Sequence, residues 1–286
     1  MEEFVVGFHK NRNFTHLAAL YFTAEGGGAA LILAALFSRR TDAVLAGLIL
    51  VLIGVGALLL DLGRPKRFWR AIYKPERSWI SRGALFVGGL VILTFLYAIL
   101  PGIRHTAAGE FLRLAAALLC LPTIAYTGLL ISSFTAVPAW NHRLTPQLFC
   151  FHSAATGLIA ARLVFQQAGV GTAAASSLAL VEILILAPAA AMTWFQYRAA
   201  AGGGPAERES ARILTQGDMK HFYLFGAILA GLALPLLLAL AAYFGSSDSV
   251  WNSGPLLAAA FLARTGGDFC YRLSILKSGV YESVLP

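Results

Sequence analysis

Charged side chains are scarce in this sequence: they make up 13% of its 286 residues, whereas a soluble domain carries about a quarter. Hydrophobic residues make up 58%, and the mean hydropathy is +0.72. A soluble globular protein is therefore excluded, because so many long apolar stretches must meet lipid rather than a protein core. The sequence predicts a protein that is embedded in a bilayer.

Short segments of alternating hydrophobicity, the mark of a transmembrane β-barrel, are also missing. The chain instead has eight apolar runs, each close to the length of about 20 residues that crosses a bilayer as a helix. We therefore predict an all-α polytopic membrane protein with eight transmembrane helices in two four-helix bundles, over residues 1–137 and 138–286. The runs cover residues 14–37, 43–62, 83–100, 111–137, 148–165, 173–197, 222–244 and 256–276.

Patterns that bind metal or heme are lacking as well. The three cysteines, Cys120, Cys150 and Cys270, lie in or beside different apolar runs without CxxC spacing, so neither an iron–sulfur cluster nor a structural zinc is suggested. Transmembrane cytochromes often hold heme between paired histidines, and none of the apolar runs carries two of the six histidines. We expect no heme and no metal in this chain.

Basic residues are divided unevenly between the two faces that eight spans would create. The face with both termini, called side A below, would hold 16 of them, including Arg272, and the opposite face, side B, would hold 4. Seven of the 16 lie in the loop 61–82, and without them the count is still 9 to 4. Basic residues in short loops favour the cytoplasmic side. We therefore expect a multi-pass protein of a bacterial or archaeal cytoplasmic membrane, with side A in the cytoplasm.

Ionisable residues inside apolar runs are costly and are candidates for function. Glu25 lies in the middle of the first run beside three glycines, and it is either a buried acid or a member of a proton relay. Arg162 and Glu182 occupy consecutive runs and are expected to pair. Arg264 and Asp268 are four residues apart on one face of the last run, so they are expected to pair with each other.

Four polar residues gather at the side A end of the first spans. Asn13 and His16 are three residues apart and share a helix face, and such a histidine could exchange a proton with a quinone or simply sit at the interface. Tyr126 lies roughly 12–17 Å deep in the fourth run, either in the same cavity or as a packing residue. Asp61 ends the second run, where it could cap the loop, pair with an arginine or line that cavity.

The loop 61–82 carries the most specific motifs. "DLGRPKRFW" (61–69) followed by "KPERSWISRGA" (74–84) resembles the membrane subunits of polysulfide reductase, NrfD-type nitrite reductase and DMSO reductase. The DMSO reductase anchor branch fits best, with eight spans and no heme. The resemblance implies a quinone site, for ubiquinone or menaquinone, formed by Asn13, His16, Asp61 and Tyr126.

The same resemblance implies the partners. Members of this family bind a ferredoxin-like four-cluster iron–sulfur subunit, which in turn binds a molybdopterin catalytic subunit with molybdenum or tungsten. This loop, with its two prolines, aromatic residues and positive charge, would be the docking platform. Membrane lipid is the other expected contact, and no nucleic-acid partner is expected. The docking residues would be Arg64, Lys66, Arg67, Phe68, Trp69, Arg70 and Trp79.

Two other functions remain open. The ionisable residues within the runs are also compatible with a secondary transporter or a proton channel, although Pro122, Pro188 and Pro235 do not interrupt matching spans of two halves. A purely structural anchor without quinone is the third interpretation. The substrate would be chosen in another chain, and a coenzyme A thioester would suit a catalytic subunit in the cytoplasm.

Overall fold

The protein is described by a computed structural model that covers residues 9–11, 14–62, 64–167, 172–245 and 253–282. Its elements, in chain order, are α1 (His16–Phe37), α2 (Thr41–Asp61), η1 (Pro65–Tyr73), α3 (Trp79–Ile99), η2 (Pro101–Ile103), α4 (Ala107–Ser132), α5 (Leu144–Gln167), α6 (Thr172–Gly202), α7 (Pro205–Thr215), η3 (Phe222–Ala233), α8 (Leu234–Phe244) and α9 (Gly254–Lys277). The predicted all-helical architecture is confirmed for the part of the chain that is described.

Among the described residues, seven helices are long and apolar enough to cross a membrane. Here η3 and α8 count as one continuous helix. The last long helix, α9, has 24 residues and packs along α5, η3 and α1, but it contains Arg264, Asp268 and Arg272. These three charged side chains lower the hydropathy of α9. A multi-pass membrane protein is thus established, while the eighth span stays a prediction.

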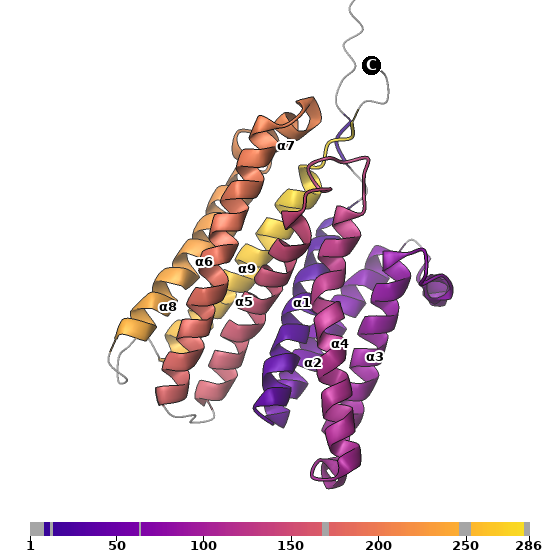
Figure 1. Ribbon diagram of the computed structural model, residues 1–286, viewed down its shortest axis with the longest axis vertical. Helices are drawn as coiled ribbons and strands as arrows, with labels where there is room; N and C mark the ends of the chain where they lie inside the picture. The colour runs from indigo at the N-terminus through magenta and orange to yellow at the C-terminus, as the bar shows by residue number, and fades with distance from the viewer. Residues whose placement is uncertain (1–8, 12–13, 63, 168–171, 246–252, 283–286) are drawn as a thin grey trace, which may run out of the picture.

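The long helices lie roughly side by side, with α1 to α4 in one part of the molecule and α5, α6, α8 and α9 in the other (Figure 1). The two parts are in close contact, since α1 and α4 both pack on α5 and α1 also reaches α9. The predicted division into two four-helix bundles at residue 137 therefore stays a prediction.

Glycines allow helices of this protein to touch backbone to backbone. A Cβ atom added at Gly28 of α1 would lie 2.8 Å from the carbonyl oxygen of Gly47 in α2, and one added at Gly157 of α5 would lie 2.6 Å from the backbone nitrogen of Leu31. Without a hydrophobic driving force between helices in lipid, such close van der Waals contact is a main source of association.

Helix starts follow ordinary capping chemistry. The hydroxyl of Thr15 accepts a hydrogen bond from the Leu17 amide at the start of α1, and Ser78 and Thr106 cap α3 and α4 in the same way. The segment 199–210 is mostly helical in spite of its three consecutive glycines: α6 runs on to Gly202 and α7 begins at Pro205. Alanines sustain the helix, and proline at its first position starts the next one.

The segments near the two ends of the chain meet on side A. The Asn11 amide donates to the Gly279 carbonyl at 2.8 Å, and Lys10 and Val280 form an isolated antiparallel β-bridge. Trp140 is buried nearby and donates from its indole nitrogen to the Ile275 carbonyl at 2.8 Å. This contact ties the end of α9 to the segment between α4 and α5.

Candidate functional site

A buried acid–phenol pair lies between α1 and α4. Glu25 is fully buried, and its Oε2 accepts a hydrogen bond from the hydroxyl of Tyr126, which is 4% exposed. Glu25 Oε1 has no hydrogen-bond partner among the described residues. A carboxyl group with one hydrogen-bonded oxygen and one oxygen without a hydrogen-bond partner can take up a proton from a neighbouring group or release one to it.

Two glycines make room for this pair. A Cβ atom at Gly54 of α2 would lie 2.6 Å from Glu25 Cγ, and a Cβ atom at Gly83 of α3 would lie 2.3 Å from Tyr126 Cε2. The side chain of Glu25 therefore packs directly on the backbone of α2, and the ring of Tyr126 packs directly on the backbone of α3. Four helices, α1 to α4, thus fix the positions of two side chains.

The other predicted quinone residues lie nearer side A. Asp61, at the end of α2, accepts a hydrogen bond of 2.6 Å from the Thr15 hydroxyl, and His16 is the exposed first residue of α1. Asn13 lies outside the described residues. Glu25 is nine residues further along α1 than His16, about 14 Å at 1.5 Å per residue. The structure thus joins Tyr126 to Glu25 rather than to His16 or Asp61.

Along α1, Tyr21 lies between His16 at the side A end and Glu25 of the buried acid–phenol pair. It is one turn of α1 before Glu25, it is 7% exposed, and it is close enough to interact electrostatically with both Glu25 and Asp61. A phenol can donate and accept a hydrogen bond. Tyr21 is therefore the ionisable side chain that is near both Asp61, at the side A end of α2, and Glu25 of the buried acid–phenol pair.

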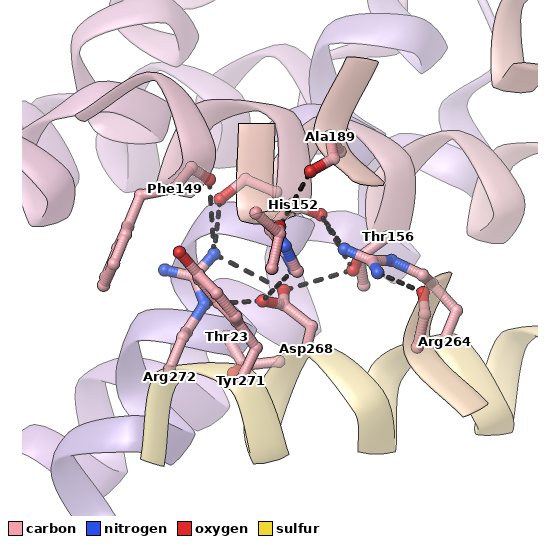
Figure 2. A network of polar contacts seen from close by, with 12 residues as sticks. Thr23, Phe149, His152, Thr156, Ala189, Arg264, Asp268, Tyr271 and Arg272 are labelled. Carbon is pink, nitrogen blue, oxygen red and sulfur yellow. Dashed lines mark hydrogen bonds and ion pairs between the residues drawn. The ribbon is translucent and has the colours of Figure 1, made fainter. Parts of the chain in front are cut away.

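A second buried network surrounds Asp268 of α9 (Figure 2). Its carboxylate accepts hydrogen bonds from Arg272 Nε at 2.8 Å and from the Thr156 hydroxyl at 3.1 Å, and it lies 3.6 Å from His152 Nδ1. The His152 ring stacks on Tyr271, with 3.9 Å between the ring centroids. The network joins α5 to α9 deep inside the protein.

The predicted pair between Arg264 and Asp268 is wrong. Arg272, one turn further along α9, pairs with Asp268 instead, while the Arg264 guanidinium donates to two backbone carbonyls, Gly231 of η3 and His152 of α5. The guanidinium fork carries donors on separate nitrogens, so one side chain can bond carbonyls of two different helices.

The other predicted pair is confirmed. Arg162 of α5 and Glu182 of α6 form an ion pair in which both side chains are almost fully buried. A cavity of about 10 Å³, room for one water molecule, adjoins it and is also lined by Pro235. Inside a membrane protein, such a pair neutralises two charges that would be costly apart.

The loop after α2 is partly exposed, as a docking surface must be. Phe68 and Trp69 of η1 are about half exposed, and the guanidinium of Arg70 lies 5.5 Å from the Trp69 ring centroid. Trp79 is half-buried at the start of α3, with the Arg82 guanidinium 4.5 Å from its ring centroid. Arg64 and Lys66 are exposed, and the side chain of Arg67 lies outside the described part.

Several residues of the buried networks are not marked by any sequence pattern. His152, Thr156 and Tyr271 lie on the inward faces of helices whose apolar residues point both ways, so no periodicity marks them. The sequence predicts Arg272 as one of the basic residues of side A, because it is close to the end of its apolar run. This prediction is wrong, since the Arg272 side chain is fully buried. Its spacing of four residues from Asp268 was the available signal.

The described residues contain no group of three or more His, Cys, Asp or Glu side chains that could hold a metal ion. Outside the spanning helices, charged side chains of α7 pair with each other: Arg212 donates to Glu209, which lowers the pKa of that carboxyl group.

Comparison with known proteins points to a family and to a relative. Residues 13–281 match the family described as "Polysulphide reductase, NrfD". Over 129 residues the chain is 31% identical to one of the subunits of the sulfite dehydrogenase of Allochromatium vinosum, a match that covers 41% of this chain and 40% of that protein. Because the family match extends over most of the chain, this membrane protein belongs to the polysulphide reductase NrfD family of oxidoreductase membrane subunits.

Proposed function

We propose that this chain is the heme-free membrane anchor of a molybdopterin and iron–sulfur oxidoreductase complex, of the DMSO reductase anchor type. It would exchange electrons between an iron–sulfur subunit and membrane quinone or quinol. The observation that carries the proposal is the Glu25–Tyr126 pair, buried beneath the side A end of α1 and α2 in a member of the NrfD family. Proton chemistry at a buried acid is what quinone turnover needs from the anchor.

A quinone would bind at this end of the helices. Asp61 and His16, with Asn13, would hold the head group at the side A end. The Glu25–Tyr126 pair would lie deeper and exchange protons with it, since Glu25 has a buried oxygen that no described residue satisfies. A bound quinone supplies two-electron, two-proton redox chemistry. The exposed His16 side chain can donate and accept hydrogen bonds at the start of α1.

Glu25 would hold a proton at its carboxyl group, and Tyr126 would orient that group through the hydrogen bond to Oε2. Tyr21, which lies near both Glu25 and Asp61, would pass a proton between the buried pair and the side A end of α2. Thr15 fixes the Asp61 carboxylate in place by its hydrogen bond of 2.6 Å.

The loop after α2 would receive the partner. Exposed aromatic side chains with adjacent basic groups, such as Trp69 with Arg70, suit an acidic iron–sulfur protein, since aromatic residues and arginine are enriched at interfaces. The relative in Allochromatium vinosum is named as a subunit of sulfite dehydrogenase, which supports assembly with a catalytic subunit. Because the match covers two fifths of that protein, it does not determine the substrate of this complex. A coenzyme A thioester is one candidate.

The eight-span topology would place both termini and this loop on one face. Because Arg272 is buried, side A has one basic residue fewer than the sequence suggests. Side A still carries more basic residues than the four of side B. The positive-inside bias would then put side A, and with it the partner subunits, in the cytoplasm.

A secondary transporter or proton channel is the alternative, and the buried Arg162–Glu182 pair with its water-sized cavity favours it. Co-purification separates the two functions. An anchor brings an iron–sulfur subunit and a molybdopterin subunit with it, whereas a transporter brings neither.

The direct test replaces His16 by alanine in the assembled complex. Quinone-coupled turnover should fall by about ten- to a thousandfold, given typical contributions of general acid–base groups, while the subunits still co-purify. His105→Ala is the matched control, because His105 is an exposed histidine at the opposite end of the helices. Turnover at the wild-type level in both variants would contradict the site.

A further inference from the structure

Arg272 connects the two buried networks. Its guanidinium is fully buried and donates to groups on three helices: Asp268 of α9, Ser153 of α5 at 2.8 Å and Thr127 of α4 at 3.5 Å. It also lies over the ring of Phe149, 4.8 Å from its centroid. These contacts to three helices hold the charge tightly in place.

Arg272 also lies close to the acid–phenol pair, because it is near the residues that directly follow Glu25 and Tyr126 in the chain. Thr127, which it contacts, follows Tyr126 in α4, and a Cβ atom at Gly26, which follows Glu25 in α1, would lie 3.5 Å from Arg272 Nη2. Its charge interacts electrostatically with both Glu25 and Tyr126. The guanidinium is therefore a cation close to the buried acid.

The charged and titratable groups that interact with Glu25, or with its neighbours Tyr21 and Arg272, come from five helices. Among the described groups that interact with Glu25 itself, Arg272 is the cation. A carboxylate deep in lipid needs such a partner, because an unpaired buried charge is strongly disfavoured. The groups are Tyr21 of α1, Asp61 of α2, Tyr126 of α4, Cys150 and His152 of α5, and Arg264, Asp268, Tyr271 and Arg272 of α9.

We propose that Arg272 is a positioning residue of the quinone site, whose charge stabilises the carboxylate form of Glu25 each time that group releases its proton. Asp268 and Ser153 hold the guanidinium in place for this role, and Thr127 keeps it next to Tyr126. The inference rests on the proposed function, in which Glu25 exchanges a proton, and it adds the group that stabilises the charged state within the membrane.

The test is an infrared titration of the purified complex in detergent. The band of a protonated buried carboxylic acid is assigned to Glu25 by its loss in Glu25→Gln. In Arg272→Met this band should persist to higher pH than in the wild type, by about one pH unit, the smaller end of the effect of a nearby opposite charge. Arg272→Lys keeps the charge and should leave the band close to its wild-type position.

Arg264→Gln is the matched control, because Arg264 is equally buried on α9 but donates to backbone carbonyls. An equal shift in Arg264→Gln and Arg272→Met would refute the specific role of Arg272, as would an unchanged band in Arg272→Met. If Arg272→Met does not assemble, Arg272→Gln combined with Asp268→Asn removes both charges of the pair without leaving either unpaired. The band should then persist to higher pH in this double variant, and an unshifted band there would overturn the proposal.

Failure of the proposed function would look different. In that case Glu25→Gln would leave both quinone-coupled turnover and its pH profile at the wild-type level. If Glu25→Gln abolishes turnover while Arg272→Met leaves the titration of Glu25 unchanged, the quinone site stands and the role of Arg272 is wrong.

Discussion

Replacing Gly54 by alanine should disturb the buried acid directly. The new Cβ atom would lie 2.6 Å from Glu25 Cγ, 3.0 Å from the Glu25 backbone nitrogen and 3.2 Å from the Tyr21 carbonyl oxygen. Two of these three atoms belong to the backbone, so the clash cannot be relieved by a rotamer change alone. Helices α1 and α2 must move apart, and Glu25 must move relative to Tyr126.

The energetic effect combines two opposing terms. Overpacking a tight contact costs about 1–3 kcal/mol, while alanine in place of glycine within a helix contributes about 0.5–1 kcal/mol of stability. We therefore expect Gly54→Ala to lower the free energy of unfolding by roughly 0.5–2 kcal/mol. Gly56→Ala, two residues away on the same helix, adds a Cβ atom with no other described atom within 4 Å. It should be neutral or stabilising.

The two variants are compared by denaturant titration of the protein in detergent micelles and by quinone-coupled turnover of the complex. Gly54→Ala should be the less stable variant and should lose turnover, since the hydrogen bond between Glu25 and Tyr126 depends on the close approach of α1 and α2. Equal stability and equal turnover of Gly54→Ala and Gly56→Ala would show that the tight packing around Glu25 is not what the protein relies on.

Three further predictions address the phenol, the cofactor content and the orientation. Tyr126→Phe leaves both oxygens of Glu25 without a described partner and should destabilise the protein by about 1–3 kcal/mol in the same titration, while an unchanged stability would mean that the hydrogen bond contributes nothing. A reduced-minus-oxidised spectrum of the purified chain should lack a b-type heme band, and a band near stoichiometric amount would refute the heme-free assignment. Fusions after Pro286 should give green fluorescence and little alkaline phosphatase activity, and the reverse would place side A outside the cytoplasm.

The composition and the apolar runs determined that this chain is an all-helical membrane protein, because a run of about 20 apolar residues must form a helix in lipid whatever its neighbours are. Each predicted run became a long helix, with ends shifted by a few residues where capping groups such as Thr106 intervene. The loop motif "DLGRPKRFW" was specific enough to give the family, which the match over residues 13–281 confirms.

The partners of the buried polar side chains were decided by the tertiary structure. Spacing along α9 favoured Arg264 as the partner of Asp268, because Arg264 precedes it by four residues. Arg272 follows Asp268 by four residues and satisfies the same rule. Only the packing of α5, α9 and η3 decides which arginine forms the pair. Glu25 and Tyr126 are 101 residues apart in the chain, so their contact depends on how α1 packs against α4. In lipid every helix face is largely apolar, and the sequence pattern therefore carries little information on which faces meet.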